Sequence, residues 1–207
     1  MLNATNARQV MAHVIDPVAK GLIKIGLGPD AITIIGTVGS SAAALYFFPQ
    51  GKLWQGCLVI VLFIFSDMLD GTMARMLNRK GSWGAFLDST LDRVTDGAIF
   101  AGLLIWFVRS EQWWMVVATT ISLIAGTIVS YAKARAEGLG MTCNVGIAER
   151  SERLIVVLVA AFFGTNGLGV PFVQEVLLWF LAAITVYTVF QRMLHVRQQA
   201  MPKVANA

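Results

Sequence analysis

Long runs of uncharged, mostly apolar residues constrain this chain more than any other feature of its sequence. The clearest run covers residues 113–132, and comparable runs recur along the chain. A helix needs about 20 consecutive apolar residues to cross the hydrocarbon core of a bilayer. Only 14% of the residues are charged, against about a quarter in ordinary soluble domains, so the sequence predicts an integral membrane protein.

Six apolar segments are separated by polar or turn-forming residues, and we expect each segment to form a membrane-spanning helix. Three of them contain too few apolar residues and must extend into polar stretches, which indicates a water-accessible cavity at one membrane face. We therefore expect an all-α integral membrane protein with a single domain over residues 1–207 and six helices within residues 28–195. The expected spans are 31–48, 53–66, 83–108, 113–132, 154–163 and 171–190.

The distribution of basic residues predicts the direction of these helices. Lysine and arginine gather at one end of the spans, whereas the opposite loops hold only Lys52 and Arg109. Because basic loops favour the cytoplasm, we expect both termini on the cytoplasmic side of the membrane. The same loops explain the net charge of +4, which gives no reason to expect a nucleic acid partner. The first residues lack the pattern of a secretory signal, so we expect none.

Residues 1–27 are expected to form an amphipathic helix in the cytoplasmic interface rather than a span. Their apolar residues recur every three or four positions, and the lysines lie elsewhere on the helical wheel. On the first span, Gly36, Ser40 and Ala44 form a row of small residues that predicts close helix packing. The apolar positions of the first helix are Val10, Val14, Val18, Leu22 and Ile25.

Four aspartates lie where the second span ends and the third begins. Asp67 and Asp70 are three residues apart, and Asp88 and Asp92 are four apart, so each pair shares one face of its helix. A short loop makes the two helices antiparallel neighbours, so we expect both pairs at a similar depth near the cytoplasm. Each carboxylate in the apolar region costs about 2.5–3.5 kcal/mol on insertion scales, and like charges nearby add to that cost.

Divalent cations offset this cost directly. Carboxylates without histidine or cysteine suit Mg²⁺ or Mn²⁺, with Ca²⁺ as a further option, and the four aspartates have enough oxygens for two ions. A solvated cytoplasmic cap and a pathway for protons or other ions are the alternatives. Transporter sites lie near the bilayer midplane, whereas these aspartates lie at a helix end, so a metal site is favoured.

A second polar cluster separates the fourth and fifth spans. Lys133, Arg135 and Arg153 lie where they can converge on a phosphate, a group that arginine and lysine bind well together. The alternative is ordinary anchoring at the cytoplasmic face, with these side chains paired to nearby glutamates. Cys57 and Cys143 have neither metal-ligand nor redox spacing and are expected to be packing residues.

The residues around the aspartates match a known pattern. Segment 67–92 reads Asp-x2-Asp-Gly-x2-Ala-Arg-x8-Gly-x3-Asp-x3-Asp and resembles the signature of the CDP-alcohol phosphotransferase family at every fixed position. The resemblance implies a six-span membrane enzyme that moves a phosphatidyl group from CDP-diacylglycerol to an alcohol. It also implies a homodimer, and it extends over nearly the whole chain.

The resemblance implies roles residue by residue. Asp67, Asp70 and Asp88 match metal ligands, and Asp92 matches an aspartate that contacts metal and acts as the general base. Asp30 matches a segment that borders the cytidine, although it can equally be a helix N-cap. The positions expected to bind CDP-diacylglycerol are Pro29, Asp30, Ala31, Ile32, Thr33, Gly71, Ala74, Arg75, Gly81 and Ser82.

The acceptor alcohol is predicted from the basic cluster and from the resemblance. Segments 26–30 and 65–70, with the residues around the basic cluster, resemble an actinobacterial branch of the family whose acceptor is inositol 1-phosphate. Three basic side chains suit an acceptor that already carries a phosphate. Glycerol 3-phosphate also carries one and stays open as an alternative acceptor, as does, outside enzymes, an ion-coupled transporter.

Overall fold

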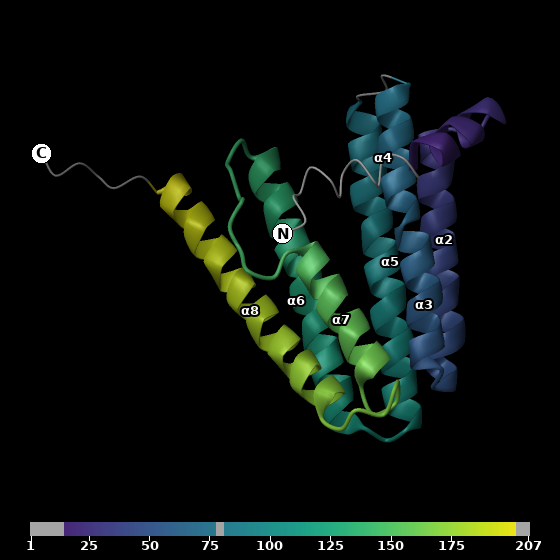
Figure 1. The fold of residues 1–207 in the computed structure, drawn as a ribbon. Coiled ribbons are helices and arrows are strands. Elements are labelled where there is room, and N and C mark those ends of the chain that lie inside the picture. The colour runs from purple at the N-terminus through teal and green to yellow at the C-terminus, as the bar shows by residue number, and fades with distance from the viewer. Residues whose placement is uncertain (1–14, 78–80, 202–207) are drawn as a thin grey trace, which may run out of the picture. The chain divides into compact units, whose positions relative to one another are not determined.

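The computed structural model describes residues 15–77 and 81–201, without the side chains of Ser66 and Asp67. Nearly all of these residues are helical, and no strand occurs among them, which confirms the all-α prediction. A helix over residues 15–24 comes first (Figure 1). It is followed by α2 (Pro29–Phe47), the 3₁₀ turn η1 (Phe48–Gln50), α3 (Leu53–Ile64), α4 (Ser66–Met76), α5 (Ser82–Arg109), α6 (Trp113–Gly138), α7 (Arg150–Phe163) and α8 (Val173–Ala200).

Within the described residues, four helical segments are long and apolar enough to cross a membrane by length and composition. The other two long helices miss this criterion for different reasons. The first half of α5 carries several charged residues, including Asp88 and Asp92, and α7 has only 14 residues. The count of six spans therefore stays a prediction. The four segments are Pro29–Gln50, Leu53–Met76, Trp113–Gly138 and Val173–Ala200.

The second predicted span consists of two helices, α3 and α4, with Phe65 between them. The backbone N–H of Met68 donates to the carbonyl of Phe65, three residues back, at 3.2 Å. Such a bond belongs to a 3₁₀ turn and tightens the chain locally. The break separates the apolar α3 from the polar α4, which carries the first half of the aspartate signature.

The chain folds into two compact units whose boundaries fall at the last residue of α2 and inside α3 and α5. The first unit comprises Met1–Tyr46 and Leu58–Ile99, and the second comprises Phe47–Cys57 and Phe100–Ala207. The predicted aspartate pairs and CDP-binding positions therefore belong to the first unit, and the basic trio belongs to the second.

Small residues on α2 allow close packing in the first unit. Gly36, Ser40 and Ala44 are all buried, as the sequence predicts. The hydroxyl of Ser40 lies 3.4 Å from that of Thr95 on α5. A β-carbon on the neighbouring Gly39 would overlap the ring of Phe63 on α3. The prediction of a packing face on this helix is therefore confirmed.

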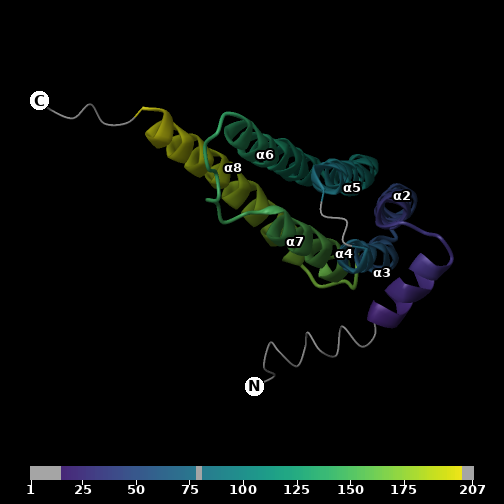
Figure 2. The same cartoon turned by 90° about the horizontal axis from the view of Figure 1, so that it is seen from above.

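The helix over residues 15–24 crosses the start of α2 at a large angle. Figure 2 looks along α2 and shows this first helix from the side. Its Ala19 is buried against Ile32 of α2 and Met73 of α4. One face is thus packed on the unit, while its position in a membrane interface stays a prediction. Of the predicted apolar positions, Leu22 borders this cluster, Val18 and Ile25 are exposed, and Val10 and Val14 lie outside the described residues.

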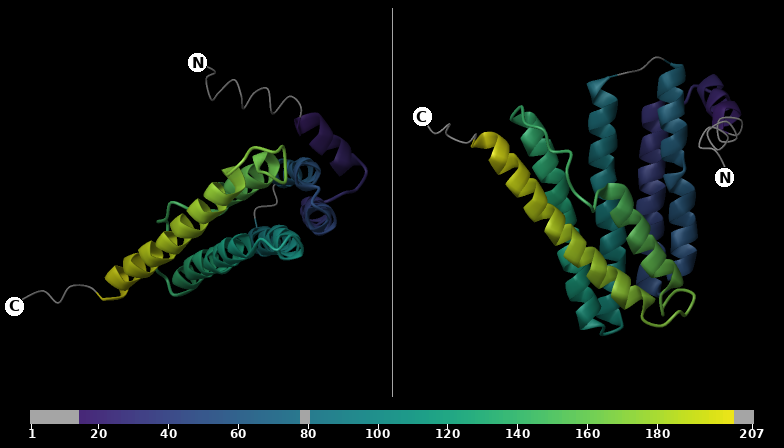
Figure 3. Two further views of the ribbon diagram at one scale, coloured as in Figure 1. Left: turned by 90° about the horizontal axis from the view of Figure 1, so that it is seen from below. Right: turned by 60° about the vertical axis from the view of Figure 1, so that its left-hand side comes forward.

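In the second unit, α8 packs along both α6 and α7, as Figures 1 and 3 show. The packed stripe of α8 starts at buried Gln174 and runs through apolar residues such as Leu178 and Leu181. It continues with buried polar residues, Thr185, Thr188 and Arg192, at helical spacing. Buried polar groups require hydrogen-bond partners: Thr185 bonds within α8, whereas Thr188 and Arg192 also bond to the loop before α7 or to α6.

Gly51 ends η1 in a left-handed conformation, with φ +74°, and an added β-carbon would lie 2.6 Å from the ring of Trp106. Gly51→Ala is therefore expected to lower the unfolding temperature through backbone strain and a steric clash. Gly26→Ala is the matched control, because Gly26 has φ +87° but open space around it. Thermal unfolding in detergent should find Gly51→Ala less stable than the control by about 1–3 kcal/mol, the usual cost of overpacking. Equal losses would contradict the close contact with Trp106.

Candidate active site

The predicted aspartates lie on α4 and on the first half of α5. Figure 1 shows that α4 ends and α5 begins at the same end of the first unit. Asp70 on α4 and Asp92 on α5 are half-buried, whereas Asp88, one turn before Asp92, is exposed. The side chain of Asp67 lies outside the described part of the structure. The antiparallel arrangement expected from the short loop thus places three carboxylates near one end of the unit.

A hydrogen bond joins the first turn of α2 to α4. The hydroxyl of buried Thr33 donates to Oδ2 of Asp70 at 2.6 Å and also lies 3.1 Å from the carbonyl oxygen of Pro29. This bond fixes one carboxylate oxygen of Asp70, as partners of metal-ligating carboxylates commonly do. The structure therefore brings a predicted metal ligand into contact with a residue predicted to bind CDP-diacylglycerol.

A second hydrogen bond joins the first turn of α2 to the start of α5. The indole N–H of Trp83 donates to Oδ2 of Asp30 at 3.2 Å. Asp30 lies within the first turn of α2, which begins at Pro29, so its interpretation as an N-cap is wrong. Two predicted phosphate contacts, Gly81 and Ser82, immediately precede Trp83 and are exposed. The bond thus holds two predicted CDP-binding segments near each other.

Gly71 and Arg75 lie one turn apart on α4. A β-carbon on Gly71 would meet no other atom within 4 Å, so a ligand can approach the backbone there. Nε of exposed Arg75 donates to the carbonyl oxygen of Gly71 at 3.1 Å, and Nη2 donates to Oγ1 of Thr72 at 3.0 Å. An arginine beside an accessible glycine is a suitable surface for a pyrophosphate. Of the other predicted positions, Pro29 and Ile32 are buried, and Ala31 and Ala74 are half-buried.

The donor set fits a hard divalent cation. Asp70, Asp88 and Asp92 offer only carboxylate oxygens, the ligands that Mg²⁺ and Mn²⁺ prefer. Among the residues that the structure describes, no three His, Cys, Asp or Glu side chains are placed to hold a metal ion together. The fourth predicted ligand, Asp67, lies outside that description. The metal ligands therefore stay a prediction supported by the chemistry of the donors.

Two charged residues of α5 that are absent from the predicted site lie beside Asp92. Nη2 of Arg93 lies 3.8 Å from Oδ2 of Asp92 and 3.6 Å from Oδ2 of Asp96. Asp96 follows Asp92 by four residues, so the spacing that groups Asp88 with Asp92 extends to it. The positive charge of Arg93 reduces the repulsion between these two carboxylates.

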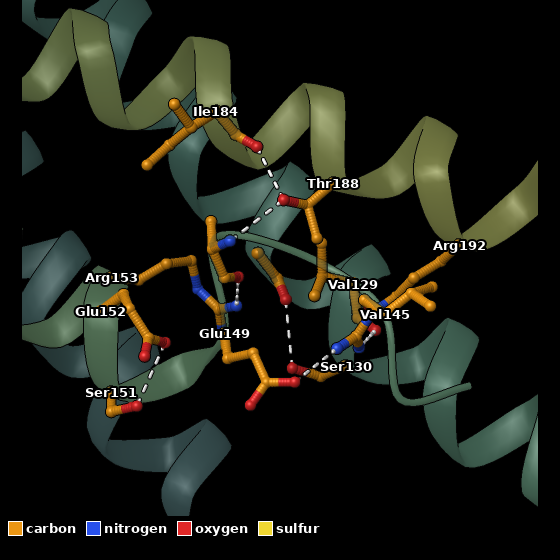
Figure 4. Close-up of polar contacts among 12 residues, drawn as sticks. Val129, Ser130, Val145, Glu149, Ser151, Glu152, Arg153, Ile184, Thr188 and Arg192 are labelled. Carbon is orange, nitrogen blue, oxygen red and sulfur yellow. Dashed lines mark hydrogen bonds and ion pairs between the residues drawn. The ribbon is translucent and has the colours of Figure 1, made fainter. Parts of the chain in front are cut away.

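The predicted basic trio differs in burial. Arg153 on α7 is only 3% exposed, and its Nη1 donates to the carbonyl oxygen of Ala148 at 3.0 Å (Figure 4). Half-buried Lys133 and exposed Arg135 lie in the last turns of α6. Their side chains form no hydrogen bond or ion pair with any residue in the described ranges. Pairing with nearby glutamates therefore does not account for these two residues.

Arg192 on α8 is absent from the predicted site residues, yet it holds the loop before α7. Its guanidinium is 3% exposed. It donates to the carbonyl oxygens of Val145 at 2.8 Å and Val129 at 2.6 Å, and it lies 3.5 Å from Glu149 (Figure 4). The sequence signal for it is a polar pair, Thr188 and Arg192, spaced by four residues at the end of an apolar helix.

The chain belongs to the CDP-alcohol phosphatidyltransferase family, whose model matches residues 27–197. A Streptomyces avermitilis protein named phosphatidylinositol phosphate synthase is 46% identical over 200 residues, which cover 94% of this chain and 82% of the relative. A protein of the same name from Mycobacteroides abscessus is 44% identical over 194 residues, covering 92% of this chain and 87% of the relative.

Crystal structures of phosphatidylinositol phosphate synthase from Mycobacterium tuberculosis share this fold. The structure with CDP-DAG bound has a TM-score of 0.84 and 43% identity, and the match covers 89% of this chain and 94% of the other. The complex with manganese and citrate has a TM-score of 0.83 and 43% identity, and the match covers 89% of each chain. The family resemblance that the aspartate signature indicates is therefore confirmed.

Arg192→Met is expected to destabilise the second unit, because two carbonyl oxygens lose a charged donor. Hydrogen bonds to charged groups contribute about 1.5–3 kcal/mol each, so we expect a loss of roughly 2–4 kcal/mol in thermal unfolding. Arg197→Met is the matched control on the same helix, since Arg197 is exposed. Limited proteolysis should also cut the loop between α6 and α7 faster in Arg192→Met. If both variants match the wild type, Arg192 does not hold this loop.

Proposed function

We propose that this protein transfers the phosphatidyl group of CDP-diacylglycerol to inositol 1-phosphate, giving phosphatidylinositol phosphate and CMP. The proposal rests on the similarity, over nearly the whole chain, to proteins named phosphatidylinositol phosphate synthase. The related structure with CDP-DAG bound supports the same lipid substrate here. Glycerol 3-phosphate is the alternative acceptor, because it too offers a phosphate to the basic trio.

In this proposal, residues 1–207 form a single catalytic domain, with an amphipathic helix within residues 1–27 and six membrane helices within residues 28–195. The four long apolar segments supply four of the six. The polar α5 and the short α7 complete the set. Both termini and the site face the cytoplasm of a bacterial inner membrane, since the basic residues gather on that side. The active protein is a homodimer.

Asp67, Asp70, Asp88 and Asp92 would hold divalent cations, with Mg²⁺ or Mn²⁺ as the preferred metal and two ions as the expected number. The manganese complex of the related structure supports this choice. When bound, the ions neutralise the negative charge of the pyrophosphate and of the leaving CMP. In this chain, Thr33 fixes the orientation of Asp70 through the 2.6 Å hydrogen bond.

The CDP moiety lies between the first turn of α2 and the exposed face of α4 in this proposal. Gly71 lets the nucleotide approach the helix backbone, and Arg75 offers forked N–H donors to the pyrophosphate. Asp30 is held by Trp83 and borders the cytidine. The full set proposed to bind CDP-diacylglycerol is Pro29, Asp30, Ala31, Ile32, Thr33, Gly71, Ala74, Arg75, Gly81 and Ser82.

The reaction breaks the phosphoanhydride bond of CDP-diacylglycerol and forms a phosphodiester with the acceptor alcohol. A hydroxyl of inositol 1-phosphate attacks the β-phosphorus that bears the diacylglycerol, and the bond from that phosphorus to the oxygen of CMP breaks. Asp92 takes the proton of the attacking hydroxyl at a carboxylate oxygen. Lys133, Arg135 and Arg153 bind the phosphate of the acceptor. Because Arg153 is buried and bonded to Ala148, it can hold that phosphate in a fixed position.

Release of CMP by the purified protein tests this function. CDP-diacylglycerol and Mg²⁺ are supplied with inositol 1-phosphate, glycerol 3-phosphate, free inositol or serine, and Asp92→Asn serves as the inactive control. Release that depends on inositol 1-phosphate is the expected result. Release with glycerol 3-phosphate alone would assign the other acceptor, and no release from folded protein with any acceptor would contradict the enzyme.

Arg153→Lys is expected to raise the KM for inositol 1-phosphate about tenfold, because a point charge replaces a planar fork. The KM for CDP-diacylglycerol should change less than about twofold, because Arg153 binds the acceptor in this proposal. Initial rates measured over a range of each substrate separate the two effects. Equal increases in both KM values would contradict the role of Arg153 in binding the acceptor phosphate.

Thr33→Val is expected to weaken metal binding about tenfold, since partners that orient metal ligands typically contribute this much. Thr33→Ser keeps the hydroxyl and should bind metal like the wild type. Free Mn²⁺ measured by electron paramagnetic resonance gives the dissociation constant without requiring turnover. Identical Mn²⁺ affinity in both variants would show that the bond to Asp70 does not orient a metal ligand.

A further inference from the structure

Ala148, in the loop before α7, connects α8 to Arg153. Its backbone N–H donates to Oγ1 of Thr188 at 3.1 Å, and its carbonyl oxygen accepts the hydrogen bond from Nη1 of Arg153 at 3.0 Å (Figure 4). Thr188 and Ala148 are completely buried, and Arg153 nearly so. The two hydrogen bonds of this loop residue thus link α8 to the side chain of Arg153 on α7.

We propose that Thr188 is a positioning residue that orients Arg153 for the phosphate of the acceptor, acting through the backbone of Ala148. The inference rests on the proposed function and adds a residue that sets acceptor affinity without touching either substrate. The bond to Ala148 is expected to help set the direction of the Arg153 guanidinium, because a misplaced arginine loses the geometry of its forked donors.

The hydroxyl of Thr188 has its direction fixed by its own helix. It donates its single proton to the carbonyl oxygen of Ile184 at 2.8 Å. Its lone pairs are therefore directed elsewhere, and one of them accepts the N–H of Ala148. A hydroxyl that both donates and accepts in a buried site has a defined orientation, and so does the loop residue bonded to it.

The loop also lies directly against α8 at Gly146. This glycine has φ +137°, and an added β-carbon would lie 2.6 Å from Cγ2 of Thr188. One turn further along α8, Arg192 holds the carbonyl oxygen of Val145 at 2.8 Å. Helix α8 therefore holds the loop at Val145 and at Ala148, and the hydrogen bond from the N–H of Ala148 to Thr188 is on the same residue whose carbonyl oxygen accepts from Arg153.

The same helix offers a matched control. Thr185 is also completely buried, on the same stripe of α8. Its hydroxyl donates to the carbonyl oxygen of Leu181 at 2.6 Å, within its own helix. Thr185→Val therefore removes a buried hydroxyl from α8 without removing a bond to the loop. Any general effect of placing valine on this stripe should appear in both variants.

Thr188→Val keeps the shape of the side chain and removes the acceptor for Ala148. We expect the KM for inositol 1-phosphate to rise about tenfold, the effect of leaving one buried donor unpaired. The KM for CDP-diacylglycerol and the kcat at saturating acceptor should stay within about twofold of wild type. Thr188→Ser should restore the acceptor KM, and Thr185→Val should leave it unchanged.

A double-mutant cycle tests whether Thr188 acts through Arg153. In an Arg153→Lys background, Thr188→Val should raise the acceptor KM no further, because the group that it positions is already altered. If Thr188→Val raises the acceptor KM by the same factor in the Arg153→Lys background as in the wild type, then Thr188 does not act through Arg153. Equal acceptor KM values in Thr188→Val and Thr185→Val would overturn the positioning role itself.

A binding measurement separates this inference from the proposed function. The rise in unfolding temperature with added inositol 1-phosphate gives a dissociation constant for each purified variant. If the wild type binds but releases no CMP, the proposed reaction fails while the comparison of Thr188→Val with Thr185→Val still decides the positioning role. If the wild type shows neither binding nor CMP release, the acceptor-phosphate role of Arg153 is overturned, and this inference with it.

Discussion

The rest of this structure depends on how a largely apolar chain accommodates charged side chains at the ends of its helices. Each such group must be satisfied locally, because an unpaired buried charge is far more costly than a paired one. The first unit uses hydroxyl and indole donors for its carboxylates, as with Thr33 and Asp70. The second uses backbone carbonyl oxygens for its buried arginines, Arg153 and Arg192.

These two solutions suit different chemical tasks. A carboxylate held by a neutral hydroxyl keeps its negative charge available to a cation, which is what a metal ligand requires. An arginine held by carbonyl oxygens keeps its positive charge, since those partners are neutral, and its orientation is fixed. Both arrangements orient a charged side chain before the substrate binds. The free energy needed to order that side chain is therefore spent in folding and not in the reaction. The proposed transfer of a phosphatidyl group from a lipid nucleotide to a charged, water-soluble alcohol would benefit from both.

The helices, including those that carry the aspartates, could be largely predicted because their signals are local. Apolar runs set the helices, and fixed spacing puts Asp88 and Asp92 on one face. The contacts of Arg192 could not be predicted in this way. Its main partners are backbone carbonyls on Val129 and Val145, up to 63 positions away. Every residue has such a carbonyl, so the sequence does not show which ones accept a hydrogen bond. The bond between Asp30 and Trp83 joins two side chains 53 positions apart, and no spacing in the sequence pairs them.

The close approach of Gly146 to Thr188 has a consequence for how this protein can change over evolutionary time. No side chain fits at position 146 while the methyl group of Thr188 stays in place. A smaller residue at position 188 would make room, but only one that retains a hydroxyl would still accept the N–H of Ala148. Drift at these two sites is therefore coupled, and even with serine at position 188 a side chain at position 146 would be strained by the φ of +137°.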